Sequence, residues 1–146
     1  MISKILMIED DSITQMLNKM VMKNTEFCKS VEVVSNGDMA IEYLQNFLIN
    51  GTENSHKKPD LILLDLNMPV MDGWDFLKIY KQKYASLFPN TKILILSSTV
   101  NPKDKERAGN DTLIIGFESK PLSFSLVERL KKESFLSIFF TGNFIE

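Results

Sequence analysis

The sequence predicts a doubly wound α/β fold, in which a five-stranded parallel sheet is covered by helices on both faces. Three short runs are almost entirely apolar, and each is followed by an acid or a hydroxyl residue: 5–8 (ILMI), 61–64 (LILL) and 93–96 (ILIL). Continuous apolar runs are typical of strands that are buried on both faces. Helical spacing of apolar residues lies between these runs. The 146 residues, of which 44% are hydrophobic, are enough for one domain with its own core.

The elements alternate regularly along the chain. Two weaker strands, at 31–34 and 114–119, complete the set of five. The first helix is indicated by apolar residues spaced along one helical face, namely Ile13, Met16, Leu17, Met20 and Val21. Asp11 or Ser12 is placed to cap it. The second helix follows the turn signal Asn36-Gly37 and has apolar or aromatic residues at the same spacing, namely Met39, Ala40, Tyr43, Leu44 and Phe47.

The remaining three helices are expected between the later strands. An amphipathic pattern runs from Trp74 to Tyr84, a short polar segment starts at Pro102, and the last pattern spans 124–131. Five strands alternating with five helices make a (βα)5 chain. Right-handed crossovers then place helices on both faces of the sheet, which is the flavodoxin-like class. In such sheets ligands bind outside the carboxyl ends of the strands, at the point where the strand order reverses.

Composition excludes several classes of function. Lys and Arg number 17 against 19 Asp and Glu, so no basic excess exists to bind nucleic acid directly. The single Cys28 cannot form an internal disulfide, which favours a reducing compartment. The first apolar run is halted by the acids at 9–11 and is too short for a signal peptide or a membrane span. We therefore expect a cytoplasmic protein without a membrane partner.

The residues at the strand ends indicate phosphoryl chemistry. Glu9 and Asp10 follow the first strand, Asp65 the third, Ser97 the fourth and Lys120 the fifth. Each alone is an ordinary turn or capping residue, but together they place three carboxylates in one cleft. Carboxylates so close repel one another unless a cation is present, and hard oxygen ligands suit Mg²⁺. Asp65 could attack phosphorus to form an aspartyl phosphate, with the metal and Lys120 neutralising the phosphoryl oxygens.

Four motifs carry a family resemblance: IEDDS at 8–12, LLDLNMPVMDGWDFL at 63–77, ILILSS at 93–98 and SKPL at 119–122. In their order and spacing they resemble a response-regulator receiver domain of two-component signalling, of the stand-alone kind found among chemotaxis regulators. The resemblance implies that Asp65 accepts a phosphoryl group from the phosphohistidine of a histidine kinase or a phosphotransfer protein. It also implies that Mg²⁺ is held by three carboxylates and one backbone carbonyl, those of Glu9, Asp10, Asp65 and Asn67.

The resemblance extends to the residues around the phosphoryl group. Ser97 and Lys120 would bind its oxygens, Phe117 stands at the aromatic switch position, and the Lys120–Pro121 peptide bond is expected to be cis. Two departures from the commonest pattern are visible. Glu9 stands where Asp is more frequent, which lengthens one ligand arm, and Ser97 replaces the more usual Thr.

We expect residues 1–132 to form the receiver domain and residues 133–146 to form an apolar C-terminal tail, with no effector domain. The output would then pass to an unknown downstream protein by direct contact. The tail either packs back on the domain or extends the last helix. Alternatively, it is an exposed apolar patch for a homodimer or a partner protein.

Three other functions are less well supported. A Mg²⁺-dependent phosphatase with an aspartyl nucleophile needs a second acid two residues later, whereas Asn67 has no proton to give there. We therefore expect no enzyme. A phosphorylation-independent pseudo-receiver scaffold is disfavoured because every pocket residue is present. A flavin-binding flavodoxin is disfavoured because acids, rather than phosphate-binding donors, follow the first strand.

Overall fold

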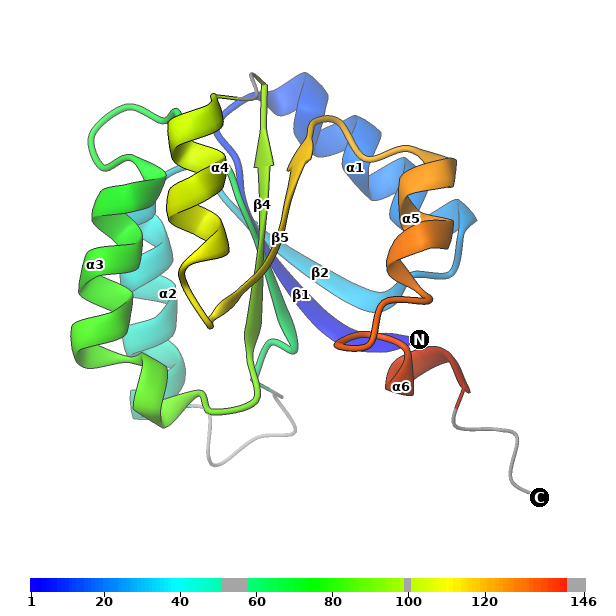
Figure 1. The fold of residues 1–146 in the computed structure, drawn as a ribbon. Coiled ribbons are helices and arrows are strands. Elements are labelled where there is room, and N and C mark those ends of the chain that lie inside the picture. Colours follow the sequence, from blue (N-terminus) through cyan, green and yellow to red (C-terminus); the bar gives the residue numbers. More distant parts are fainter. Residues whose placement is uncertain (51–57, 99–100, 142–146) are drawn as a thin grey trace.

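A computed structural model describes residues 1–50, 58–98 and 101–141 (Figure 1). Its centre is a five-stranded sheet in the order β2-β1-β3-β4-β5, with every neighbouring pair parallel. The strands are β1 (Ile2–Ile8), β2 (Cys28–Val34), β3 (Leu61–Leu64), β4 (Lys92–Ser97) and β5 (Ile114–Ser119). The predicted doubly wound fold is confirmed. The strand order reverses at β1, so the carboxyl ends of β1 and β3 lie side by side at the switch point.

Helices cover both faces of this sheet. The long ones are α1 (Ser12–Asn24), α2 (Gly37–Asn50), α3 (Gly73–Lys83), α4 (Pro102–Gly109) and α5 (Phe124–Leu130). A 3₁₀ turn, η2 (Ala85–Leu87), follows α3, and a short helix, α6 (Ile138–Thr141), lies near the C-terminus. Figure 1 shows α2, α3 and α4 on one side of the sheet and α1 and α5 on the other. Among the described residues no helix has both the length and the apolar character that a bilayer span requires.

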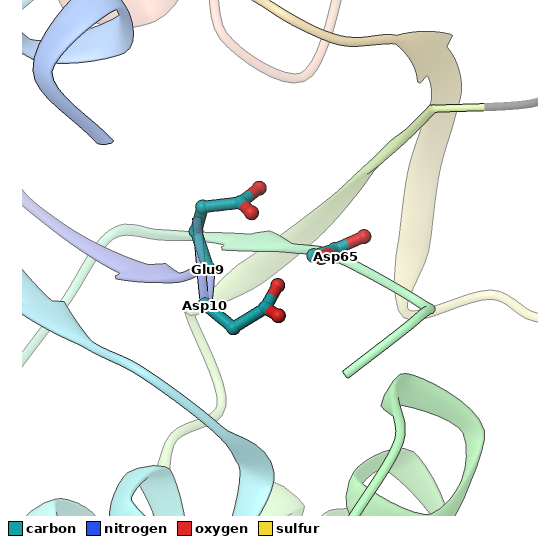
Figure 2. Close-up of side chains that lie close together, drawn as sticks. All are labelled: Glu9, Asp10 and Asp65. Atoms are coloured by element: carbon teal, nitrogen blue, oxygen red, sulfur yellow. The ribbon is translucent and has the colours of Figure 1, made fainter. Parts of the chain in front are cut away.

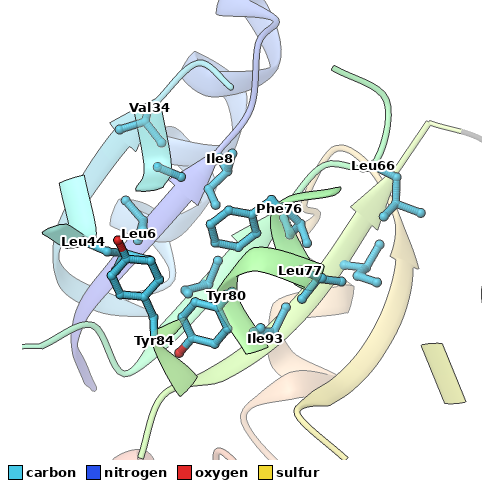
Figure 3. Close-up of a cluster of buried hydrophobic side chains, with 14 of the residues drawn as sticks. Leu6, Ile8, Val34, Leu44, Leu66, Phe76, Leu77, Tyr80, Tyr84 and Ile93 are labelled. Atoms are coloured by element: carbon cyan, nitrogen blue, oxygen red, sulfur yellow. The ribbon is translucent and has the colours of Figure 1, made fainter. Parts of the chain in front are cut away.

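The core consists of two apolar clusters, one on each face of the sheet. Alternate residues of β1 supply them: Leu6 points to the cluster under α2 and α3, and Ile5 points to the cluster under α5. Figure 3 shows the first cluster, where Phe76 and Tyr80 of α3 pack with their ring centroids 5.7 Å apart. Since the strand is covered on both faces, its apolar run has no alternation. This is the physical basis of the pattern that predicted the strand.

Helix α1 forms where the spacing predicts it, but its apolar stripe lies mostly on the surface. Asp11 caps it, because its carboxylate accepts a hydrogen bond from the backbone N–H of Thr14 at 2.8 Å. The face that packs on the sheet contains Asn18 and Met22, which are both 1% exposed. Four residues of the apolar stripe are between 38% and 62% exposed: Ile13, Met16, Leu17 and Met20. Helical spacing identified the helix but not the face that is buried.

The described part of the C-terminal tail packs back on the domain. Leu136 is fully buried in the cluster on the α5 side, and Phe140 stacks on Phe27 with ring centroids 5.8 Å apart. The N-terminal amine donates to the Phe139 carbonyl at 2.7 Å, so the tail lies beside the start of β1. Helix α6 is separate from α5 and does not extend it. Residues 142–146 lie outside the described residues, and a homodimer through the tail stays a prediction.

Candidate functional site

Three carboxylates meet at the carboxyl ends of β1 and β3. Glu9 and Asp10 follow β1 and Asp65 follows β3, and one carboxylate oxygen of each lies within 4.8 Å of the others (Figure 2). Glu9 is 2% exposed and Asp65 is 1% exposed, whereas Asp10 is exposed at the mouth of the site. Parallel pairing of the two strands continues one residue further, because the Asp65 N–H donates to the Ile8 carbonyl at 3.0 Å. The sheet itself therefore sets the spacing of the acids.

Lys120 reaches into this cluster from the end of β5. Its Nζ lies 3.1 Å and 3.0 Å from the two carboxylate oxygens of Glu9 and 3.1 Å from Asp65 Oδ2. The Lys120 backbone N–H donates to the Ser97 carbonyl at 2.9 Å, which joins the ends of β4 and β5. The Lys120–Pro121 peptide bond is cis. One ammonium thus contacts two of the three acids of the cluster, Glu9 and Asp65, and the acids outnumber it by two.

Burial dominates the electrostatics of the two inner acids. It raises the pKa of Glu9, and the Asp11 N–H at 3.1 Å and the Lys120 ammonium only partly offset this effect. Burial also raises the pKa of Asp65 against the opposing charge of Lys120. For Lys120 burial lowers the pKa, but its hydrogen bonds and charge interactions with Glu9 and Asp65 outweigh burial, so its pKa lies above the usual value. A divalent cation would relieve the remaining repulsion.

The loop after Asp65 folds back tightly under the site. Asn67 is exposed in this loop, and its N–H donates to Asp65 Oδ1 at 3.3 Å. Val70 has a φ of 72°, a left-handed conformation that β-branched residues rarely adopt. Gly73 closes the loop, because a Cβ there would lie 2.7 Å from the Asp65 carbonyl oxygen. The backbone around Asp65 is therefore held by close packing that only glycine permits at residue 73.

Ser97 and Phe117 lie on the neighbouring strands β4 and β5. Ser97 ends β4, is 2% exposed and is tied to Lys120 through the backbone. Phe117 pairs with Ile95 of β4 and is half-buried against the apolar cluster under α2 and α3. The structure thus brings the three acids and Lys120 into direct proximity, places Ser97 beside Lys120 in the sheet, and places Phe117 against the core.

Two polar residues of α1 support the site and were not identified from the sequence. The Gln15 side chain donates to the Glu9 carbonyl at 2.6 Å. The Asn18 side chain, which is buried, accepts from the Leu122 N–H at 2.9 Å. Both lie between the apolar residues whose spacing predicted the helix. That spacing identifies only apolar positions, so it could not show that these two polar residues have a role. The sequence contains no other signal for them.

The arrangement fits a small, hard divalent cation. Carboxylate oxygens are the ligands that Mg²⁺ prefers, and one of the three acids, Asp10, is exposed, so the cluster can be reached from solvent. The surplus negative charge gives the binding its electrostatic basis. An acid at the floor of such a site, beside an ammonium group, is placed to act as a nucleophile toward phosphorus.

Comparison with known proteins gives a consistent family. The family model described as the response regulator receiver domain matches residues 5–131. The hybrid signal transduction histidine kinase M of Dictyostelium discoideum is 30% identical over 132 residues, which are 88% of this chain and 5% of that protein. The two-component response regulator ORR41 of rice is 28% identical over 123 residues, which cover 82% of this chain and 84% of that protein. Two further curated relatives are covered over only 37% and 48% of their lengths.

Solved structures show the same fold. The crystal structure of a two component response regulator from Cytophaga hutchinsonii is 28% identical, with a TM-score of 0.79. The similarity covers 88% of this chain and 93% of that one. The similarity therefore covers most of the chain rather than the aspartate loop alone.

Proposed function

The chain belongs to the family of response regulator receiver domains, and we propose that Asp65 is its phosphorylation site. The phosphoryl group would come from the phosphohistidine of a histidine kinase or a phosphotransfer protein. The observation that carries this proposal is the position of Asp65. Its carboxylate is buried at the end of a central strand, 3.1 Å from the Lys120 ammonium and beside two further acids.

The proposed step is a displacement at phosphorus. A carboxylate oxygen of Asp65 forms the new P–O bond as the P–N bond to the donor imidazole breaks, and the imidazole takes up the bonding electron pair. Glu9, Asp10, Asp65 and the Asn67 backbone carbonyl would hold a Mg²⁺ ion, which would supply positive charge for the phosphoryl oxygens. Lys120 supplies a second positive charge from the side of β5.

Ser97 and Phe117 then convert the chemistry into a structural change. The Ser97 hydroxyl donates a hydrogen bond to a phosphoryl oxygen, and its shift toward Asp65 leaves space for Phe117 to turn inward. Support comes from their positions on adjacent strands, since Ser97 ends β4 and Phe117 of β5 pairs with Ile95, two residues before Ser97. A two-state element of this kind is biased by the two negative charges that phosphorylation adds.

The exposed apolar stripe of α1 (Ile13, Met16, Leu17 and Met20) is the proposed contact surface for the phosphodonor protein. Helix α1 begins at Ser12, two residues after Asp10, so this stripe leads to the mouth of the site. The only charged residues within α1 are Lys19 and Lys23. The surface therefore favours a donor that presents apolar side chains flanked by acids.

We propose that output also passes through protein contact. In this proposal residues 1–132 form the receiver, and residues 133–146 form a tail whose described part adds to the receiver core. The phosphorylated state would be recognised by a downstream protein, and no direct contact with nucleic acid is needed. The near balance of 17 basic and 19 acidic residues supports this view.

Mass spectrometry of the intact protein tests the proposal. Incubation with acetyl phosphate and Mg²⁺ should add about 80 Da, the mass of one phosphoryl group. The Asp65→Asn variant should show no adduct. The matched control is Asp38→Asn, which changes an exposed aspartate in the first turn of α2 and should react as the wild type does. An unmodified wild-type protein, or an adduct that persists in Asp65→Asn, would overturn the assignment.

A further inference from the structure

Asn18 is a buried amide on a helix whose apolar stripe is largely exposed. The residue is 1% exposed and lies on the inner face of α1. A polar side chain in such a position lowers stability unless its polar atoms are hydrogen-bonded. Apolar residues are available on the same helix, so hydrophobic packing does not explain why an asparagine occupies the inner face. Its contacts do.

The two polar atoms of Asn18 join two backbone segments that are far apart in the sequence. Asn18 Oδ1 accepts from the Leu122 N–H at 2.9 Å, and Nδ2 lies 3.5 Å from Met7 Sδ. Leu122 is two residues after Lys120, and Met7 is two residues before Glu9. One buried side chain therefore connects the segment that carries Lys120 with strand β1, which Glu9 directly follows.

The Lys120 backbone is held on both sides. On one side, the Lys120 N–H donates to the Ser97 carbonyl at 2.9 Å. Pro121 has no N–H to donate, so the next backbone donor along the chain is Leu122. The Leu122 N–H donates its hydrogen bond to Asn18 Oδ1. The lysine stem is flexible, and the position of its ammonium group depends on where this short segment is fixed.

We propose that Asn18 is a positioning residue for Lys120. It fixes the segment 120–122 against α1, so that Lys120 Nζ reaches both Glu9 and Asp65. This inference rests on the function proposed above, because the ammonium matters for phosphoryl transfer to Asp65. A merely structural role would instead require only that the Leu122 N–H be satisfied, with no specific effect on Lys120.

A double-mutant experiment separates these two roles. Asn18→Leu keeps the size of the side chain but removes the acceptor, and it should slow phosphorylation by acetyl phosphate about tenfold, as loss of a supporting hydrogen bond typically does. In the Lys120→Ala background the same change should have less than about a twofold effect, since a positioning residue has nothing left to position. Asn18→Asp, which keeps an oxygen acceptor, should restore most of the rate.

The matched control is Met22→Ala, which alters the other fully buried residue of α1. It leaves a cavity and lowers stability, but it should leave the phosphorylation rate unchanged. If Asn18→Leu does not fold, Asn18→Ser replaces it, because serine is too short to reach the Leu122 N–H. Circular dichroism verifies folding for each variant before the rates are compared.

A second readout needs neither metal nor phosphodonor. In protein labelled with ¹³C at the lysine ε-carbon, the Lys120 signal is identified by its loss in Lys120→Ala. It should shift in Asn18→Leu and stay in place in Met22→Ala. An unphosphorylated wild type would overturn the function itself. If the wild type is phosphorylated and Asn18→Leu reacts equally fast, only the role of Asn18 is overturned. The same holds if Asn18→Leu slows phosphorylation as much in the Lys120→Ala background as in the wild type.

Discussion

The Lys120 ammonium lies 3.1 Å from the Asp65 carboxylate, although 55 residues separate the two along the chain. The lysine side chain is 13% exposed and the aspartate side chain 1%. Both charges are thus largely removed from water. In the protein interior a paired charge is far less costly than a single one. The Lys120 ammonium therefore balances part of the charge of the acidic cluster.

Lys120→Met tests this balance. Removal of the ammonium leaves Glu9 and Asp65 buried without a counter-charge, so the metal-free variant should lose about 2–4 kcal/mol of unfolding free energy. Mg²⁺ should raise the melting temperature of the variant more than that of the wild type, because the cation replaces the missing charge. Lys103→Met, at an exposed position in α4, is the control for general effects of the substitution. An equal response to Mg²⁺ in all three proteins would contradict the prediction.

The acidic cluster should make Mg²⁺ binding dependent on pH. Burial raises the pKa of Glu9 and of Asp65, and only the ionised carboxylates bind the cation. Affinity should therefore be full above the raised pKa values and fall as the pH drops through them, at a higher pH than for exposed carboxyl groups with a pKa of about 4. Isothermal titration with Mg²⁺ at constant ionic strength measures this, and a constant affinity down to about pH 4.5 would count against it.

Mg²⁺ affinity should fall as the pH drops, but the stability of the protein without Mg²⁺ should respond to pH in the opposite direction. Between the unfolded and the raised folded pKa values, the folded protein binds more protons than the unfolded chain, so the contribution of Glu9 and Asp65 to stability increases as the pH falls. Glu9→Gln removes one of these groups and should flatten the slope. Urea unfolding of the metal-free proteins over the same pH range provides the comparison.

Gly73→Ala should be destabilising because the added methyl group has no space. Its Cβ would lie 2.7 Å from the Asp65 carbonyl oxygen and 2.8 Å from Leu66 Cα, and both are backbone atoms that cannot move independently. We expect a loss of about 1–3 kcal/mol and slower phosphorylation, since the displaced backbone carries Asp65. Gly109→Ala is the matched control, because no atom lies within 4 Å of its added Cβ. Equal stabilities of the two variants in urea would exclude the steric explanation.

Trp74 holds the polar helix α4 against α3. Its indole N–H donates to Asp104 at 3.1 Å, and the Arg107 guanidinium lies 4.1 Å from its ring centroid. A double-mutant cycle between Trp74→Leu and Arg107→Ala should give a coupling free energy of about 0.5–1 kcal/mol. Hydrogen exchange of the α4 amides should accelerate in Trp74→Leu, while α2 amides stay as in the wild type. Additive stabilities would show that the contact contributes nothing.

Leu136 should contribute to stability as a core residue. It is fully buried in the cluster on the α5 side, so Leu136→Ala should cost about 2–5 kcal/mol. Ile138, two residues later, is 72% exposed, and Ile138→Ala should change the unfolding free energy by less than about 0.5 kcal/mol. Chemical denaturation measures both. Similar losses in the two variants would mean that the described part of the tail is not part of the core.

The strands, and the acids and lysine that meet at their ends, could be predicted from local sequence. Strands buried on both faces are continuously apolar, and each apolar run therefore identified a strand and also where it ends. Parallel strands share one carboxyl edge, so Glu9, Asp65 and Lys120 could be expected together without any knowledge of their contacts. The start of β1 was missed, because Ser3 and Lys4 interrupt the apolar pattern there.

Only the tertiary structure decided how these parts face one another. The spacing of Ile13 and Met16 determined a helix, but the sheet and the segment after Lys120 decided that Asn18 points inward. In the same way, the long arm of Glu9 reaches Lys120 only because β1 and β5 end at one edge. Apolar periodicity records a local preference for burial. Which face is buried, and which charges meet, depends on segments more than 100 residues apart in the chain.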